Sequence, residues 1–500
     1  MDALLRRCGL ACAVALVAAA AAPGAFAATK SVPGTSIARE LRAGHAFVED
    51  DLTVRGPLDL TGVEVVRRVF KCRKCAFRGP VRAPDVTFER TLDLSGSTFR
   101  GEVDFRGATL RGPALFRALV ETEQGEDQPV TFKGPADFSL AVFDDFASYG
   151  GSEFEQAVAF RDTRFSDGTF ASTIFHGTAA FDRAAFRGAA LFNSAEFKDA
   201  ASFEEADFQK RTDFSLAIFD AGGFFSGAQF ANGASFLATQ FFAGAEEAAR
   251  FDDVAASGDL DFTFASFTPK GSGPNVVAAF SHLVCSQSVV FRDTSFPEDS
   301  DLEITMDQLQ VANLILDVDV VSQIQDDESD ENQRAVLRSI ENSAKARDDL
   351  ATANDAHYEL RVLRSEDFGP VLRGLDYVFY RQIAGYLVRP ARPLALLLTL
   401  ATALAVIRVV RTQAEPASQR PSRRRVSRTR RIWRGTRRRC ADFLTCFLDK
   451  LAMAGPRWGG DKSALGTRLE IIAYRLLLVC AVLGLANSNP TLRQMVDTLF

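Results

Sequence analysis

Phenylalanine recurs along the middle of this 500-residue chain with a fixed period. The chain holds 43 Phe against six Tyr and two Trp, so its aromatic residues are mostly those without a polar group. Two series of Phe each repeat every eleven residues, and together they alternate gaps of five and six. A short fixed period predicts a solenoid, in which each unit buries its apolar face against its neighbours. The series are Phe181, Phe192, Phe203, Phe214, Phe225 and Phe236, and Phe186, Phe197, Phe208, Phe219, Phe230 and Phe241.

A small residue stands two positions before each of these Phe residues, as Ala179 does before Phe181 and Ala201 before Phe203. Residues two apart point to the same side of an extended segment. We therefore expect Ala and Phe to face inward and the residue between them to face outward. Stacked coils would place one ring over another about 4.8 Å apart. The twelve Phe residues are interpreted as a core ladder and not as a ligand site.

The segment "AAFDRAAFRGAALFNSAEFKDAASFEEADFQKRTDFSLAIFD" resembles the pentapeptide-repeat superfamily, in particular its Phe-centred branch. The resemblance runs from about Phe88 to Phe296, and the alternation of five and six departs from a strict five-residue repeat. It implies an all-β, right-handed parallel β-helix. With two eleven-residue units in each coil, this range corresponds to about nine or ten coils. The resemblance is specific for architecture and carries little information about function.

The N-terminus has the pattern of a secretory signal peptide. Arg6 and Arg7 precede an apolar run, and Ala25-Phe26-Ala27 fits a cleavage site of the A-x-A kind. We expect cleavage at Ala27, with an uncleaved anchor as the alternative. After the signal peptide at 1–27 we expect an N-terminal cap region at 28–87 and the β-helix at 88–325.

The period changes to three and four after the repeats, as at Leu337, Ile340 and Ala344, which predicts helices. These helices would cap the open edge of the solenoid. His357, on one of them, is interpreted as a packing residue. The expected segments are a helical cap and linker at 331–366, an interfacial helix at 375–390, a transmembrane helix at 391–411, a basic cytoplasmic loop at 412–440, an amphipathic helix at 441–454, a second transmembrane helix at 469–487 and a tail at 488–500.

The charges of the chain are strongly partitioned. Residues 408–440 hold thirteen Arg and one Glu, whereas the net charge of the whole chain is −6. Basic loops stay on the cytoplasmic side, so the chain would span the membrane twice, with both its β-helix and its tail outside. The Arg-rich loop would contact anionic lipid. A cytoplasmic partner or nucleic acid is the alternative for this loop, whereas the acidic remainder is not expected to bind nucleic acid.

Few residues suggest chemistry. The four His are far apart, and no metal-ligand spacing, nucleophile elbow or phosphate-binding loop occurs, so neither a catalytic residue nor a cofactor or metal is expected. Cys72 and Cys75 form the one compact motif. In an exported domain it favours a structural disulfide, with a redox pair or a zinc half-site as alternatives. Cys285 is expected to be a buried thiol.

These observations predict a non-catalytic binding or scaffolding protein of the bacterial envelope. It would be held in the cytoplasmic (inner) membrane, with its β-helix on the periplasmic side and an envelope protein as partner. Export separates it from the topoisomerases on which DNA-mimicking pentapeptide-repeat proteins act. One alternative is a β-helix enzyme or binder that acts on envelope polysaccharide. A minor one is a degenerate two-span channel-like module, although residues 456–466 lack a potassium filter.

Overall fold

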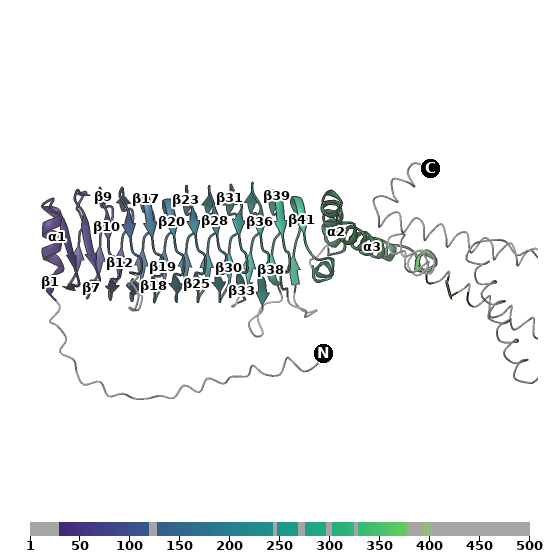
Figure 1. Ribbon diagram of the computed structural model, residues 1–500, viewed down its shortest axis with the longest axis horizontal. Coiled ribbons are helices and arrows are strands. Elements are labelled where there is room, and N and C mark those ends of the chain that lie inside the picture. Colours follow the sequence, from purple (N-terminus) through teal and green to yellow (C-terminus); the bar gives the residue numbers. More distant parts are fainter. Residues whose placement is uncertain are drawn as a thin grey trace, which may run out of the picture.

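The protein is a straight rod of parallel β-coils followed by helices, as the computed structural model shows (Figure 1). The structure describes residues 30–119, 128–243, 248–268, 276–296, 303–324 and 329–377, together with Ala395, Leu398, Thr399 and Thr402. The rod is a parallel β-solenoid of about 12 coils, which confirms the predicted solenoid. At about 4.8 Å per coil its length is on the order of 55–60 Å.

Each regular coil has four faces, and each face is made of one short strand. In one coil β21 (Ile174–Phe175) lies on face 1, β22 (Ala179–Ala180) on face 2, β23 (Ala185–Phe186) on face 3 and β24 (Ala190–Leu191) on face 4. The next strand, β25 (Glu196–Phe197), returns to face 1 and pairs with β21 in parallel. The alternation of five and six residues is therefore compatible with four strands in a coil of 22 residues.

Faces 1 and 2 are separate sheets, whereas faces 3 and 4 are joined into a third sheet by strands that bend round their common corner. Face 1 contains β1 Ser31–Pro33, β3 Thr53–Arg55, β7 Ala76–Phe77, β11 Thr98–Phe99, β15 Thr131–Phe132, β18 Glu153–Phe154, β21, β25, β29 Ile218–Phe219, β33 Gln240–Phe242 and β37 Ser266–Thr268. Face 2 contains β4 Leu58–Asp59, β8 Val81–Arg82, β12 Val103–Asp104, β16 Ala136–Asp137, β19 Val158–Ala159, β22, β26 Ala201–Ser202, β30 Gly223–Phe224, β34 Ala249–Arg250, β38 Val276–Ala279 and β40 Glu303–Thr305.

The third sheet has 19 strands. Those on face 3 are β5 Val65–Val66, β9 Thr87–Phe88, β13 Thr109–Leu110, β23, β27 Asp207–Phe208, β31 Gln229–Phe230 and β35 Ala255–Ala256. Those on face 4 are β2 Phe47–Asp50, β6 Phe70–Arg73, β10 Leu92–Asp93, β14 Ala114–Leu115, β24, β28 Thr212–Asp213, β32 Ala234–Ser235 and β36 Leu260–Asp261. Those that cover both faces are β17 Val142–Ser148, β20 Arg164–Thr169, β39 Val284–Val290 and β41 Gln310–Ile315.

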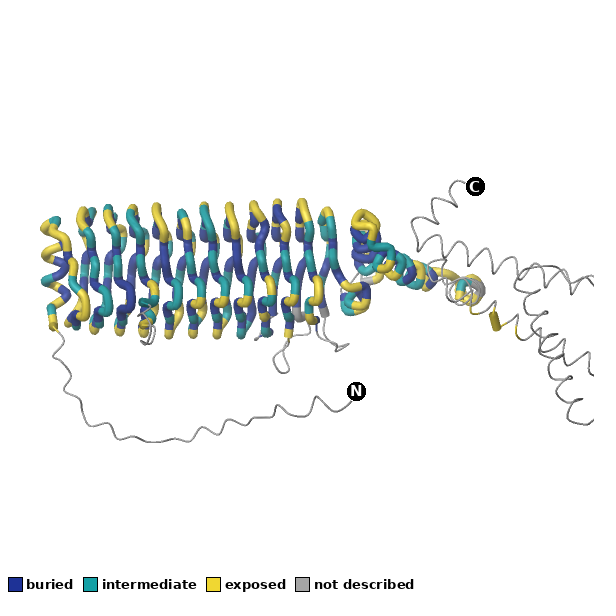
Figure 2. Tube along the Cα trace, in the orientation of Figure 1, coloured by how far each residue is buried: buried dark blue, intermediate teal, exposed yellow. Residues whose placement is uncertain are grey.

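The core is the ladder of rings that the sequence predicts. All twelve Phe residues of the two series are fully buried. Rings one coil apart are stacked, as Phe181 and Phe203 are with centroids 4.9 Å apart. Rings within one coil meet edge to face, as Phe181 and Phe192 do at 5.3 Å and 89°. Both arrangements are favourable for aromatic quadrupoles, so each ring is held by neighbours in two directions. Figure 2 shows the buried positions recurring in every coil.

Where two inward Phe residues are five positions apart, the corner between their strands is a tight turn. One residue of this turn has the left-handed backbone conformation. In one such turn the amide of Ala184 donates to the carbonyl of Phe181 at 3.0 Å, and Arg183 has φ of 54°. The left-handed position also holds Leu216 and Phe264, at φ of 60° and 58°. Such residues have no local preference for this conformation. The pairing of the flanking strands with the coils above and below holds them in it.

The solenoid begins well before Phe88, so the expected cap region at 28–87 is itself made of coils. β1 pairs with β3, and helix α1 (Gly34–Arg42) covers the N-terminal end by burying Ile37 and Leu41. The Phe period misses these coils because Val54 and Leu58 take the inward positions. This earlier start is why the described solenoid has more coils than the nine or ten expected.

Helices close the C-terminal end, as expected. A 3₁₀ helix η1 (Val318–Gln323) is followed by α2 (Ser329–Ala346), α3 (Leu350–Glu366) and the short α4 (Pro370–Leu375). The hydroxyl of Ser343 on α2 accepts a hydrogen bond from the amide of Leu314 in the last strand, at 2.8 Å. The carboxylate of Asp349 caps α3 through the amide of Thr352. The helices therefore cover backbone groups that the last coil would otherwise expose.

Among the residues that the structure describes, no helix is both long and apolar enough to cross a membrane. The predicted signal peptide at 1–27, most of the interfacial helix at 375–390, nearly all of the first predicted span at 391–411 and the segments 412–440, 441–454, 469–487 and 488–500 lie outside the described residues.

Candidate binding surface

The two cysteines of the compact motif form a disulfide within β6 and the corner that follows it. The Cα atoms of Cys72 and Cys75 are 5.6 Å apart. Both side chains are buried, at 0% and 1% exposure, so the sulfurs are shielded from a redox partner. The hydroxyl of Ser97 in the next coil donates to the carbonyl of Cys72 and accepts from the amide of Cys75. The disulfide and the hydrogen bonds of Ser97 together stabilise this corner of the early coils. Cys285 is a free, buried thiol.

Many outward Asp residues support the corners of the rod. The carboxylate of Asp93 accepts a hydrogen bond from the amide two residues on, and Asp137 and Asp213 do the same at 2.9–3.0 Å. Such Asx turns hold a tight corner in place. The sequence pattern that marks such a corner is an Asp directly before an inward Phe or Leu. The turn begins at the residue after that Phe or Leu. The role of these carboxylates is therefore structural.

Other surface carboxylates pair with bases of the same or the next coil. Arg183 pairs with Asp162 at 2.8 Å, and Lys198 lies 3.2 Å from Asp220. Burial raises the pKa of Asp104, but the hydrogen bonds and charge of Arg106 outweigh it and hold that pKa below its usual range. These groups are therefore already partnered within the chain.

The histidines do not gather into a site. His176 lies 2.8 Å from Glu153, His282 lies 3.8 Å from Asp253, and His357 lies 3.0 Å from Glu341. His45 is exposed on the N-terminal end. Within the described residues no three His, Cys, Asp or Glu side chains are grouped in a way that could hold a metal ion.

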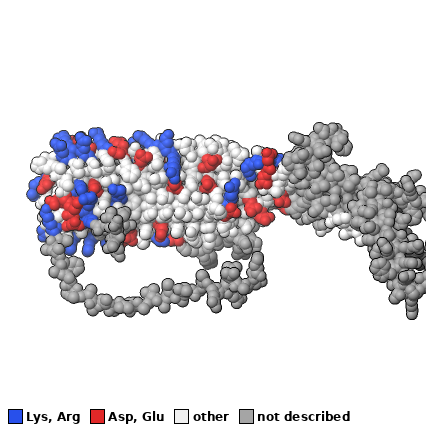
Figure 3. Space-filling model, in the orientation of Figure 1, with Lys and Arg blue, Asp and Glu red and all other residues white. Residues whose placement is uncertain are grey.

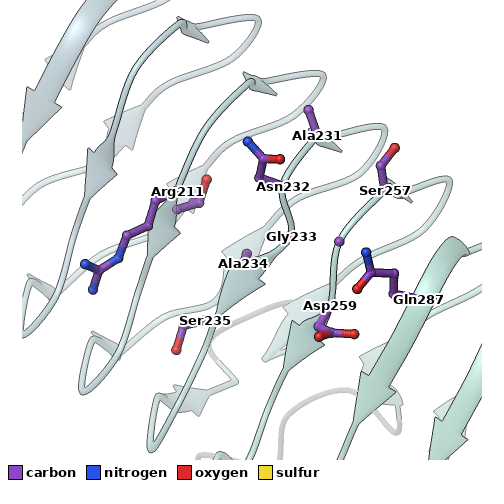
Figure 4. Close-up of a pocket in the computed structure, with 11 residues that line it drawn as sticks. Arg211, Ala231, Asn232, Gly233, Ala234, Ser235, Ser257, Asp259 and Gln287 are labelled. Atoms are coloured by element: carbon purple, nitrogen blue, oxygen red, sulfur yellow. The ribbon is translucent and has the colours of Figure 1, made fainter.

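An open cleft of about 510 Å³ follows the corner between faces 3 and 4 in the later coils (Figure 4). Two of its polar side chains are bonded to their own chain: Arg211 to Asp213 at 2.7 Å, and Asn232 to the carbonyl of Gln209 at 3.1 Å. Asp259 is the one carboxylate that lines the cleft, and it accepts from the amide of Ser288. Glycoside hydrolysis usually requires two carboxylates across the bond, so this cleft does not favour the polysaccharide-cleaving alternative.

Charge is unevenly distributed along the rod. Residues 30–119 hold 16 Lys and Arg against 11 Asp and Glu, whereas residues 214–243 contain one charged side chain, Asp220. Figure 3 shows the basic groups gathered toward the N-terminal end and a largely uncharged middle on the visible face. Sequence reasoning missed this basic end because the net charge was summed over the whole chain outside the Arg-rich loop.

Three large apolar side chains are exposed on the corner between faces 4 and 1, in three successive coils. Leu216, Leu237 and Phe264 have exposed fractions of 60%, 39% and 59%. The amide of Leu216 donates to the carbonyl of Leu237, which shows that the corners lie one above the other. We call these three residues the apolar ridge. Exposed apolar side chains that gather in one place mark a candidate interaction surface.

A family model for pentapeptide repeats, described as nine copies, matches residues 170–218 and again residues 181–229. The middle of the chain is a run of pentapeptide repeats. The matched coils are the most regular part of the Phe ladder, in agreement with the resemblance noted from the sequence. No curated protein and no solved structure matches the chain.

Proposed function

We propose that this pentapeptide-repeat protein is a non-catalytic binding or scaffolding rod of the cell envelope. The observation that carries the proposal is the apolar ridge, whose three large side chains stay exposed on successive coils of a rigid rod. Pentapeptide-repeat proteins are generally non-catalytic, which agrees with this role. The ridge offers a partner protein apolar area on a rigid support in a stretch with little charge.

The proposal places the rod outside the cytoplasm, attached to the inner membrane. Its support is the sequence: a signal peptide with cleavage at Ala27, apolar segments at 391–411 and 469–487, and thirteen Arg between residues 408 and 440. A phosphatase that is active only outside the cytoplasm tests this topology. It should be active when fused after Phe500 and inactive when inserted near Ser422. The reverse pattern would overturn the proposed orientation.

Proximity labelling in intact cells tests the binding role. The labelling enzyme is fused at the tail, and the variant carries Leu216→Asn and Phe264→Asn, because Asn tolerates the left-handed conformation. The matched control is Leu140→Asn, since Leu140 has the same backbone conformation and is 62% exposed on another corner. We expect the ridge variant to lose specific labelled proteins that the control retains. If both variants label the same proteins as the unchanged chain, the ridge is not a binding surface.

A further inference from the structure

A column of basic residues follows the corner between faces 1 and 2 in the first coils. Arg55, Arg78, Arg100 and Lys133 occupy the same place in four successive coils. Backbone hydrogen bonds show this register. The amide of Arg78 donates to the carbonyl of Val54 in the preceding coil, and the amides of Arg100 and Lys133 donate to the equivalent carbonyls of Phe77 and Phe99. All four residues are exposed. Paired strands are about 4.8 Å apart, so the column presents one cation per coil at that spacing.

The three arginines of this column have no partner among the residues that the structure describes. Arg55, Arg78 and Arg100 form neither an ion pair nor a side-chain hydrogen bond with any residue that the structure describes. Farther along the same column the signs alternate: Lys133 pairs with Glu155, and Lys198 pairs with Asp220. Like charges on adjacent strands are destabilising. The first coils therefore carry a repulsion that the later coils of the same column avoid.

The surroundings of the column suit a ligand that runs along the rod. Gly79 and Gly101 follow the arginines, and a Cβ at either would lie within 2.8 Å of the backbone of the preceding corner. The position directly after each arginine therefore has no side chain, and the next residue is Pro in two of these coils and Glu102 in the third, which pairs with Arg82 at 3.1 Å. Two residues before Arg100 and Lys133, on the same outward side, stand Thr98 and Thr131 on face 1. The coils of Arg100 and Lys133 therefore present a cation and a neighbouring hydroxyl, whereas the coil of Arg78 has Ala76 at the hydroxyl position.

We propose that Arg55, Arg78, Arg100 and Lys133 form a binding site for a linear anionic polysaccharide, whose chain lies along the corner with its acidic groups on successive rungs. Arginine binds carboxylate and sulfate groups in a bidentate manner, and the threonine hydroxyls match the hydroxyls of the sugar. This inference deepens the proposed envelope-binding role, and it rests on that role for the location of the rod beside envelope polymers.

Single-stranded nucleic acid is a poorer match for this surface. Proteins that bind it stack its bases on aromatic side chains. Within residues 30–119 the one large apolar side chain that is exposed is Val48, so this end of the rod has no exposed aromatic platform. The column therefore offers charge and hydroxyls without a surface for bases.

The opposite corner, between faces 3 and 4, provides a matched control. Arg67, Arg68 and Arg90 are exposed there, and they too have no ion pair with a described residue. The column of Arg67 continues with Glu89, which lies 4.0 Å from Arg111, so acidic and basic groups alternate. Replacing three arginines at either corner changes the net charge equally but removes an all-basic column only at the first.

Binding of purified full-length protein to polygalacturonate tests the inference, with neutral dextran and an oligo-dT strand as comparison ligands. The column variant is Arg55→Gln, Arg78→Gln and Arg100→Gln, and the control is Arg67→Gln, Arg68→Gln and Arg90→Gln. We expect polygalacturonate to bind and dextran not to bind. The column variant should weaken binding by about tenfold or more and the control by less than about threefold, as expected for lost charge-assisted contacts. Arg78→Gln alone should give an intermediate loss of binding, and none of these variants should lower the unfolding temperature, because each removes a like-charge contact or an exposed charge.

Three results would overturn the inference: no binding of polygalacturonate, equal losses in the two triple variants, or oligo-dT binding that exceeds polygalacturonate binding and depends on the column. The last would assign the column to nucleic acid. Because these measurements use protein in solution, they are separate from the topology and labelling experiments. If the protein does not bind polygalacturonate but keeps its topology and its ridge-dependent partners, the proposed scaffolding role still stands.

Discussion

Single rings determine how much each coil contributes to the stability of the rod. Phe203 stacks on Phe181 and Phe225 at 4.9 Å and meets Phe192 and Phe214 edge to face at 5.2 Å. A ring enclosed in this way by other rings cannot be removed without leaving a cavity, because the stacked coils above and below fix the ring positions.

Phe203→Ala should therefore lower the free energy of unfolding by about 3–5 kcal/mol. The neighbouring Glu204 is exposed, and Glu204→Ala should cost less than about 0.5 kcal/mol. Thermal or denaturant unfolding of the two variants measures both values. Equal shifts would show that the alternation of inward and outward residues is assigned wrongly.

Tyr149 is the one position where the ladder carries a polar group. Its ring stacks between Phe116 at 5.1 Å and Phe170 at 5.0 Å, and its side chain is fully buried. Among the residues that the structure describes, its hydroxyl finds no hydrogen-bond partner, and burial raises the pKa of the phenol well above its usual value. An unsatisfied buried hydroxyl costs about 1–3 kcal/mol.

We expect Tyr149→Phe to raise the free energy of unfolding by about 1 kcal/mol, since it restores the ladder and removes the unsatisfied group. The matched control is Phe170→Tyr, which places the same hydroxyl one coil farther along and should destabilise the rod. Denaturant unfolding compares the pair. A destabilised Tyr149→Phe would mean that the hydroxyl has a partner in solution.

At the scale of elements, α2 and α3 are joined by a small charged cluster. The carboxylate of Glu341 on α2 is 8% exposed and lies 2.5 Å from Lys345 and 3.0 Å from His357 on α3. Burial raises the pKa of Glu341, but the hydrogen bonds from Lys345 and His357 outweigh it, so the pKa lies below its usual value. His357 is thus more than the packing residue that the sequence suggested, since it links the two helices.

A carboxylate with a lowered pKa stabilises the folded state above its unfolded pKa of about 4.3, and this contribution is lost as the pH falls through the folded value. Glu341→Gln should therefore lower the unfolding temperature at pH 7, and the difference from the unchanged protein should shrink below about pH 4.3. Thermal unfolding of both proteins between pH 3 and pH 7 measures it. A difference that stays constant with pH would exclude the ion cluster as its cause.

The elements also show how far sequence reasoning reaches. The Phe ladder and the capping helices could be predicted because their periods, eleven residues and three to four, follow directly from burial of one face. The first coils could not, because Val54 and Leu58 replace the aromatic signal. The left-handed corner at Phe264 has no local propensity and depends on pairing with neighbouring coils. The basic column becomes visible only when residues are aligned by strand pairing, because Arg78 follows Arg55 after 23 residues whereas Lys133 follows Arg100 after 33.

At the scale of the whole molecule, the rod is a stack whose coils contact only their neighbours, so its two ends are its vulnerable points. Exposed strand edges pair readily with other chains. Helix α1 covers one end. Only glycine fits at position 34, because a Cβ there would lie 2.3 Å from the carbonyl oxygen of Pro57. Helices α2 and α3 cover the other end, where Gln333 donates to the carbonyl of Ile324 at 2.8 Å.

A mature chain that starts at Ala28 and ends after Ile324 should therefore self-associate, because β41 and the last coil would present free backbone groups. A chain with the same start that ends after Tyr377 keeps α2 and α3 and provides the control, which should remain monomeric at the same concentration. Sedimentation velocity over a range of concentrations measures the difference, and circular dichroism verifies that both chains keep their β-structure. If the shorter chain is folded and monomeric, the last coil protects its own edge and the helices serve another purpose.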